Sequence, residues 1–168
     1  IQEKPLQYIT HSQEFMGLSF YVDENVLIPQ PDTEILVEQA LAKIQSIEGR
    51  EIQILDLCTG SGAIAISIEK QLQATRQHGK EKEYQIVATD ISDKALKVAQ
   101  KNARQNQVQK QIQFLQSDMF SNLKKKEFDV IVSNPPYIET KVIQTLSREV
   151  RKEPKIALDG GDDGLKFY

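Results

Sequence analysis

The sequence is poor in the residues that build covalent cross-links and metal sites. Among its 168 residues there is one cysteine, Cys58, and there are two histidines, His11 and His78. A single cysteine excludes a disulfide within the chain, and the two histidines lie far apart in polar surroundings without companion cysteines. We therefore expect no metal site, and the reducing environment of the cytoplasm is the simplest location.

The chain also lacks long apolar runs and a strong excess of basic charge. No apolar stretch approaches the roughly 20 residues that a membrane helix needs, and no basic stretch followed by an apolar one opens the sequence. The net charge is −3, with 39% hydrophobic and 27% charged residues. This composition is typical of a single soluble domain and provides no sequence-wide reason to bind nucleic acid. We expect neither a membrane nor a nucleic acid as a direct partner.

Short apolar runs alternate with helical patterns along most of the chain. Residues 13–22 contain two short runs divided by Gly17, which indicates a β-hairpin. Strands are expected at 52–57, 85–89, 112–115 and 128–132, with helices between them, one of which has Ser92 as its N-cap. An earlier helix is expected to be capped by Asp32 or Thr33, and residues 165–168 to start another. The alternation predicts an α/β fold with a doubly wound, mainly parallel sheet.

A glycine-rich stretch follows the first strand of the predicted sheet. It reads Asp-Leu-Cys-Thr-Gly-Ser-Gly, and its candidate ligand-binding residues are Asp56, Cys58, Thr59, Gly60, Ser61 and Gly62. Glycines let a ligand approach the backbone, and the helix start offers free N–H groups. Together with Ala65 the glycines also satisfy the dinucleotide fingerprint, so NAD is an alternative ligand. Asp56 disfavours NAD, because its carboxylate would repel a pyrophosphate but could accept hydrogen bonds from a cationic amino group.

Acidic residues follow the next two strands. Asp90 ends the second strand, where a carboxylate is expected to take both hydroxyls of a ribose. It lies 30 residues after Gly60 (90 − 60 = 30), and the polar stretch 71–83, expected to be a solvent loop, explains the excess over the usual spacing of about 20. After the third strand, Asp118 could accept from the exocyclic amine of adenine, and Met119 could pack on its ring. In chain order these residues predict an adenosine pocket.

The fourth strand runs into Asn134, Pro135, Pro136 and Tyr137. Two prolines fix the backbone and remove two N–H donors, so the strand ends in a stiff turn whose carbonyls stay free. Asn134 adds a side-chain amide, and Tyr137 adds a flat aromatic face. These groups suit a planar substrate that carries an NH₂ group, and the same four residues also fit an ordinary turn that closes a strand.

Several short sequence motifs, spread over nearly the whole chain, form a recognisable combination. They lie at residues 13–22, 28–34, 56–62, 133–137 and 153–164, and the most specific are Pro-Gln-Pro-Asp-Thr-Glu at 29–34 and Gly-Gly-Asp-Asp-Gly at 160–164. Together they resemble the peptide chain release factor glutamine methyltransferases of the HemK/PrmC family, a class I S-adenosylmethionine-dependent family. The chain departs from this family at Gln30, where arginine is usual, and at Met119, where an aromatic residue can contact adenine.

The resemblance implies a Rossmann-like class I methyltransferase fold in which residues 32–168 bind S-adenosylmethionine and residues 1–31 form a β-hairpin preface and linker. It implies methyl transfer to the side-chain amide nitrogen of the glutamine in the Gly-Gly-Gln motif of a release factor. Asn134 and the Pro135 carbonyl would hold this amide, Tyr137 would pack beside it, and Asn134 would also border the cofactor. The family's N-terminal helical domain and last strands are not in this sequence, so we expect a chain truncated at both ends.

Three other functions stay open at this point. A sibling enzyme methylates a glutamine of a ribosomal protein, which the segment 31–34 disfavours. An amino-methyltransferase for nucleic-acid bases would be expected to carry a basic groove or an added recognition domain. A non-catalytic nucleotide-binding module would bind NAD and not S-adenosylmethionine.

Overall fold

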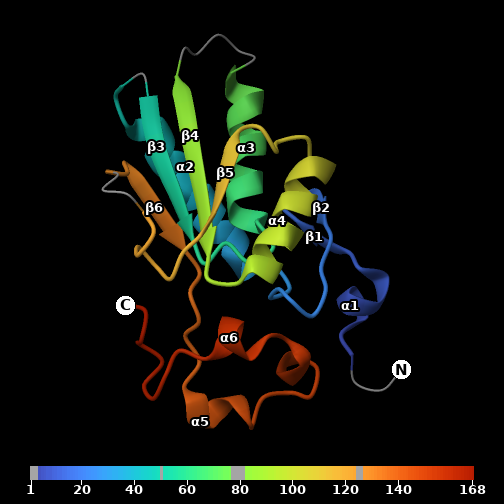
Figure 1. The fold of residues 1–168 in the computed structure, drawn as a ribbon. Coiled ribbons are helices and arrows are strands. Elements are labelled where there is room, and N and C mark those ends of the chain that lie inside the picture. The colour runs from blue at the N-terminus through green and yellow to red at the C-terminus, as the bar shows by residue number, and fades with distance from the viewer. Residues whose placement is uncertain (1–3, 50, 77–81, 124–126) are drawn as a thin grey trace.

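The centre of the fold is a parallel β-sheet. The computed structural model describes residues 4–49, 51–76, 82–123 and 127–168. Within them, β3 (Glu51–Leu57), β4 (Glu83–Asp90), β5 (Ile112–Gln116) and β6 (Val130–Ser133) form a four-stranded sheet in the order β5-β4-β3-β6 (Figure 1). All three strand pairs are parallel, so the four carboxyl ends lie along one edge of the sheet.

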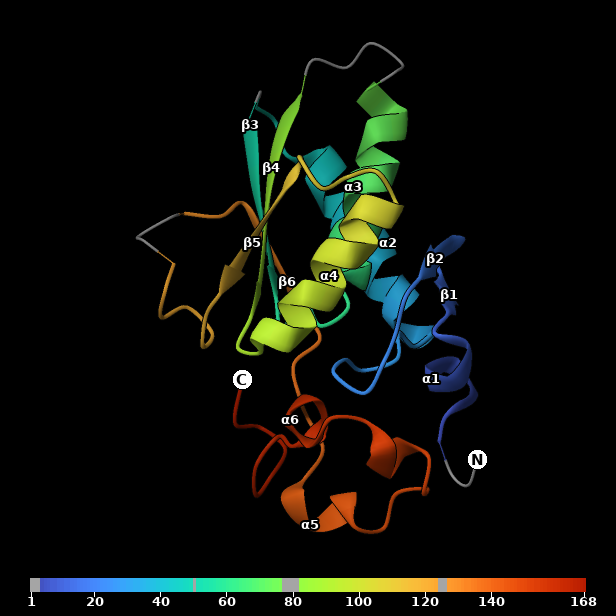
Figure 2. The same cartoon turned by 45° about the vertical axis from the view of Figure 1, so that its right-hand side comes forward.

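The three long helices cover one face of this sheet (Figure 2). They are α2 (Asp32–Ser46), α3 (Ala63–Arg76) and α4 (Asp93–Gln105). Their apolar side chains recur every three or four residues, as on α4, where Leu96, Ala99 and Ala103 are buried. The Ser92 hydroxyl accepts a hydrogen bond from the backbone N–H of Ala95, which confirms the predicted N-cap of α4.

The opposite face of the sheet is covered differently. Leu55, Leu57 and Val87 pack there against Met119 and other side chains of the segment between β5 and β6. At the edge of this face the side chain of Ile131 remains half exposed. The predicted α/β fold with a parallel sheet and a hairpin is confirmed, and the three long helices α2, α3 and α4 all lie on one face of the sheet.

A small N-terminal unit packs beside α4. It consists of α1 (Leu6–Thr10) and the antiparallel pair β1 (Gln13–Phe15) and β2 (Leu18–Phe20), which confirms the predicted hairpin. Met16 and Gly17 both have positive φ, 52° and 70°, as the tightest hairpin turn requires. Residues 21–31, which we call the strap, then cross to the sheet edge, with Val22, Val26 and Ile28 buried against α4.

The C-terminal part of the chain lies beneath the carboxyl ends of the strands (Figures 1 and 2). It contains α5 (Thr140–Ile143), the short 3₁₀ helix η1 (Val150–Lys152) and α6 (Lys155–Leu158). Residues 165–168 form a turn and no helix, so the helix predicted there is wrong. Among the described helices there is none whose length and apolarity would let it span a bilayer.

Two other expectations about local structure are wrong in part. The polar stretch 71–83 was expected to be a loop, but α3 continues to Arg76 and β4 starts at Glu83, while residues 77–81 lie outside the described ranges. Glutamine and alanine are strong helix formers, so polarity alone does not end a helix. The expected cap by Asp32 or Thr33 is wrong as well: the N-cap of α2 is Pro31, whose side chain has no hydrogen-bond acceptor, and Asp32 and Thr33 lie within the helix.

Candidate active site

A cavity of about 260 Å³ lies at the carboxyl edge of the sheet. This volume is close to the lower end of the range for ligand pockets, about 300–1,000 Å³. Parallel α/β sheets bind ligands at this edge, because the loops that follow the strands meet there. The predicted site residues that line the cavity are Cys58, Thr59, Gly60, Ser61, Asp90, Asp118, Met119, Asn134 and Pro136. The sequence had placed them after four different strands, and the fold brings them together.

Four predicted site residues do not line this cavity. Asp56 is fully buried behind the glycine loop, and Pro135 is buried in the turn after β6. A Cβ on Gly62 would lie 3.1 Å from the Ala99 Cβ, so Gly62 permits close packing of the loop on α4. The side chain of Tyr137 is 61% exposed and lies at the surface beyond the cavity wall.

Asp56 holds the shape of the glycine loop. Its Oδ2 accepts hydrogen bonds from the Thr59 hydroxyl at 2.6 Å and from the Ala65 N–H at 3.1 Å, while Oδ1 is buried without a partner in the described part of the chain. Burial raises the pKa of the Asp56 carboxyl to about 7, opposed by these two hydrogen bonds. Asp56 therefore shapes the loop that borders the cavity and does not line the cavity itself.

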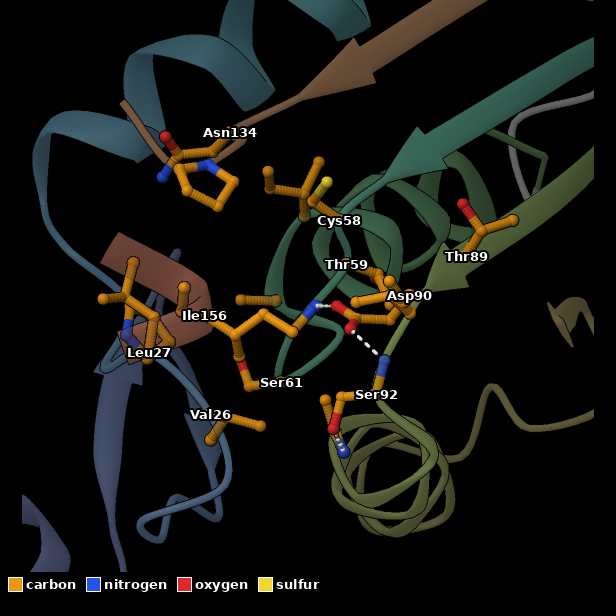
Figure 3. Close-up of a pocket in the computed structure, with 18 of the residues that line it drawn as sticks. Val26, Leu27, Cys58, Thr59, Ser61, Thr89, Asp90, Ser92, Asn134 and Ile156 are labelled. Atoms are coloured by element: carbon orange, nitrogen blue, oxygen red, sulfur yellow. Dashed lines mark hydrogen bonds between the residues drawn. The ribbon is translucent and has the colours of Figure 1, made fainter. Parts of the chain in front are cut away.

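Asp90 joins the glycine loop to the start of α4 (Figure 3). Its Oδ2 accepts from the Gly60 N–H and its Oδ1 from the Ser92 N–H, both at 2.9 Å. Burial raises the pKa of the Asp90 carboxyl, and the backbone N–H groups of Ser92 and Gly60 oppose this. Each carboxylate oxygen keeps a further lone pair, so Asp90 can still accept hydrogen bonds from a ligand's hydroxyl groups.

The part of the cavity beyond Asp90 is bordered by sulfur. The Cys58 Sγ lies 3.9 Å from the Met119 Sδ, and Asp118 lines the cavity next to Met119. Burial and the nearby Asp90 raise the pKa of the Cys58 thiol to about 11, so the thiol stays protonated and is a poor nucleophile. Polarizable sulfur atoms beside a carboxylate are suited to binding a flat ring that carries an amino group.

Asn134 lies at the other end of the cavity (Figure 3). Its Nδ2 donates a hydrogen bond to the Thr33 hydroxyl at 3.3 Å, and the described residues offer no donor to its Oδ1. The preceding residue, Ser133, donates its hydroxyl to the Leu57 carbonyl at 2.9 Å, which anchors the end of β6 to β3. The cavity is therefore bordered by a side-chain amide on a rigid support, whose oxygen is free to accept from an NH₂ group.

Several lining residues were not predicted to belong to the site. They come from the hairpin, the strap, α2, α4 and the C-terminal segment, and include Phe15, Asn25, Val26, Leu27, Pro29, Gln30, Thr33, Ser92, Ile156, Ala157, Lys166 and Phe167. The strap is held in place by hydrogen bonds from the Tyr8 hydroxyl to the Val26 carbonyl (2.6 Å) and from the Ile28 N–H to Glu153 (2.9 Å). The sequence had singled out the segments 13–22, 28–34 and 153–164 by resemblance, and Thr33 and Ser92 as possible helix caps, but it had assigned none of these lining residues to the site.

No group of three or more His, Cys, Asp or Glu side chains within the described ranges is placed to hold a metal ion. The chemistry available at the cavity is that of carboxylates, amides, hydroxyl groups, backbone groups, sulfur and the ammonium group of Lys166.

Comparison with known proteins gives consistent results. The chain is 45% identical over 164 residues to the release factor glutamine methyltransferase of Moorella thermoacetica, which covers 98% of this chain and 54% of that protein. It is 39% identical over 163 residues to the ribosomal protein uL3 glutamine methyltransferase of Francisella tularensis subsp. tularensis, which covers 96% of this chain and 49% of that protein. The chain thus spans about half the length of the curated relatives it matches.

The fold and the family agree with these matches. The crystal structure of the hMettl16 catalytic domain in complex with the MAT2A 3′UTR hairpin 6 has a TM-score of 0.63 and 16% identity, covering 96% of this chain and 66% of that one, which shows a shared fold. A family model described as the methyltransferase small domain matches residues 31–161, the part of the chain that contains the whole sheet and most of the cavity lining. The chain belongs to the methyltransferase small domain family.

Proposed function

We propose that this chain is the catalytic part of an S-adenosylmethionine-dependent enzyme that methylates the side-chain amide nitrogen of a glutamine in a peptide chain release factor, within its Gly-Gly-Gln motif. The family is a methyltransferase family, and the similar protein of Moorella thermoacetica is named a release factor glutamine methyltransferase. The single observation that supports the substrate is the Asn134 amide, which borders the same cavity as Asp90 and whose Oδ1 has no donor among the described residues.

The residues of the cavity fit S-adenosylmethionine. Asp90 would accept from the ribose hydroxyls, and Asp118 with Met119 would bind the adenine. The glycine loop and the start of α3 would hold the amino-acid end, with Asp56 fixing the loop from behind. When bound, this cofactor supplies an electrophilic methyl group on a sulfonium.

The role of the chain in the reaction is mainly to orient the substrate. An amide nitrogen is a poor nucleophile because its lone pair is delocalised, so its two N–H groups must be held for the nitrogen to point at the methyl group. The Asn134 Oδ1 would accept from one N–H, and the Pro135 carbonyl would take the other. Positive charge grows on the nitrogen during transfer, and such acceptors bind it more strongly as it grows. Tyr137 would pack beside the planar amide from the surface.

The proposal extends to the surroundings of the enzyme. A release factor substrate places the protein in the cytoplasm, with a soluble protein and neither a membrane nor a nucleic acid as its direct partner. Residues 1–31 would be a preface and linker and residues 32–168 the cofactor-binding domain, because α2 begins at Asp32. The strap would then contribute part of the cofactor site from outside that domain.

A second candidate substrate is a glutamine of ribosomal protein uL3. The similar protein of Francisella tularensis carries that name, and an amide acceptor such as Asn134 would serve either glutamine equally well. The two substrates differ in the chain around the glutamine and not in the reacting group. The choice between them is therefore an experimental one.

The test is a methylation assay with the full-length protein that contains this chain. Purified release factor and uL3 are incubated separately with enzyme and S-adenosylmethionine, and their peptides are analysed by mass spectrometry. We expect one added methyl group on the Gly-Gly-Gln glutamine, absent with Asn134→Ala. Methylation of uL3 alone would favour the second candidate. If neither protein gains a methyl group, and calorimetry shows binding of NAD but not of S-adenosylmethionine, the methyltransferase proposal is wrong.

A further inference from the structure

The first turn of α2 connects two features that are far apart in the sequence. Thr33 and Glu34 begin the helix, with their backbone N–H groups donating to the Gln30 carbonyl at 3.0 Å and the Pro31 carbonyl at 2.9 Å. The side chain of Thr33 reaches Asn134, and that of Glu34 reaches the hairpin turn at Met16. The methyl-transfer scheme alone assigns no task to this turn.

The contact between Thr33 and Asn134 affects which atom the site presents. A side-chain amide has a donor end and an acceptor end of nearly the same shape, so packing alone does not distinguish its two orientations. Here the Nδ2 of Asn134 donates to the Thr33 hydroxyl at 3.3 Å, and the two residues are 101 positions apart. Because the donor end is bound to Thr33, the acceptor end is left for the ligand.

The first turn of α2, which contains Thr33, is itself held by the structure around it. The Glu34 Oε1 accepts from the Met16 N–H at 2.7 Å, so the start of α2 is bound to the hairpin on one side and to Asn134 on the other. Thr33 is β-branched and has a restricted χ1 angle, which limits where its hydroxyl can lie. Thr33 is also part of the cavity lining, so its hydroxyl and the Asn134 amide border the same space.

We propose that Thr33 is a positioning residue that binds the donor end of the Asn134 amide, leaves the amide oxygen free to accept from a ligand, and so makes the site prefer an NH₂ group over a carboxylate. The orientation of the Asn134 amide decides whether the site attracts an NH₂ group or a carboxylate. An amide oxygen attracts the N–H groups of a glutamine and repels the carboxylate of a glutamate, whereas the NH₂ end would do the reverse. This inference rests on the proposed function for its substrate, but the Thr33–Asn134 contact can be tested without any turnover.

The experiment compares Thr33→Val, Thr33→Ser and the control Thr145→Val in the full-length protein. Valine has nearly the shape of threonine without its hydroxyl, and serine keeps the hydroxyl. Thr145 is an exposed threonine whose hydroxyl donates to the Val142 carbonyl, and it does not line the cavity, so its replacement repeats the chemical change elsewhere. Thermal unfolding of each variant identifies any that fails to fold.

Two readouts are specific for positioning. The first is hydrogen exchange of the Asn134 side-chain NH₂, followed by NMR, which we expect to be faster in Thr33→Val and unchanged in the other two variants. The second is transfer to a Gly-Gly-Gln peptide. With Thr33→Val we expect kcat to fall roughly 2- to 12-fold, the range of one neutral hydrogen bond, with binding of S-adenosylhomocysteine unchanged. Competition by a Gly-Gly-Glu peptide should strengthen in this variant.

The outcomes distinguish the positioning role of Thr33 from the proposed function of the enzyme. Unchanged exchange of the Asn134 NH₂ in Thr33→Val overturns the positioning role, whatever the activity. A loss of kcat in Thr33→Val with no change in the competition by Gly-Gly-Glu overturns its part in selecting the substrate. If the wild-type enzyme shows slow exchange at Asn134 but methylates no glutamine, the proposed function is wrong while the contact itself stands.

Discussion

Replacement of Gly160 by alanine is expected to slow methyl transfer without preventing folding. Gly160 lies beside the turn that follows β6, where its N–H donates to the Ile138 carbonyl at 2.8 Å. A Cβ at this position would lie 2.7 Å from the Cα of Tyr137 and 2.8 Å from its carbonyl carbon. Both are backbone atoms, so no side chain can rotate away to make room.

The size of the effect follows from these distances. Carbon atoms in contact are separated by about 3.5 Å or more, so the backbone at Tyr137 or at Gly160 must move by roughly 0.8 Å. Pro136 precedes Tyr137 and restricts its own φ angle, so the displacement would be passed toward Asn134. A misplacement of about 1 Å can cost about 100-fold in rate. We therefore expect Gly160→Ala to lower the single-turnover rate by about 10- to 100-fold.

Gly161→Ala is the matched control. Gly161 has φ of +87°, and the nearest atom to its added Cβ would be the Lys166 Cβ at 3.2 Å, so a shift of a few tenths of an ångström is enough to make room. Its expected cost is the backbone strain of a left-handed alanine, about 1–2 kcal/mol of stability. We expect a melting temperature lower by about 2–8 °C and a nearly normal transfer rate. A folded Gly160→Ala enzyme that transfers methyl groups as fast as the wild type would refute the reasoning.

Two further predictions concern the proposed cofactor site. Asn102 is fully buried on α4, accepts from the Tyr21 N–H at 2.7 Å, and donates to the Ser61 carbonyl at 2.8 Å. By calorimetry, Asn102→Ala should therefore bind S-adenosylhomocysteine roughly 10-fold more weakly, whereas Asn106→Ala, which loses bonds to the Ser19 and Asn102 carbonyls only, should bind it normally. The raised pKa of Asp56, about 7 in the folded chain against about 3.9 when unfolded, means that the folded state binds more protons between these values. The free energy of unfolding should thus fall as the pH rises from about 4 to 7. Urea unfolding at both ends of this range should show a smaller change in this free energy for Asp56→Asn than for the wild type. An equal change in the variant would contradict the prediction.

Much of the cofactor side of the site could be predicted from the sequence. The acid after β4, Asp90, and the glycines after β3 come at strand ends, and parallel strands place their carboxyl ends at one edge. Asp56 shows the limit of this reasoning. Its type and spacing indicated contact with a ligand, but it is buried behind the loop and bonded to Thr59 and Ala65. Spacing tells which loop a residue belongs to, and packing decides which way its side chain points.

Secondary structure could be predicted because it depends on residues that are close together in the sequence. Hydrophobic periodicity and turn residues act over a few positions, so the succession of strands and helices along the chain, and the cap of α4 at Ser92, could be predicted from the sequence. Contacts between side chains far apart in the sequence could be found only from the tertiary structure. Thr33 reaches Asn134 across 101 positions, and Glu153 binds the Ile28 N–H across 125. Such contacts depend on how the hairpin, the helix layer and the C-terminal segment pack together, and no pattern within a single segment carries that information.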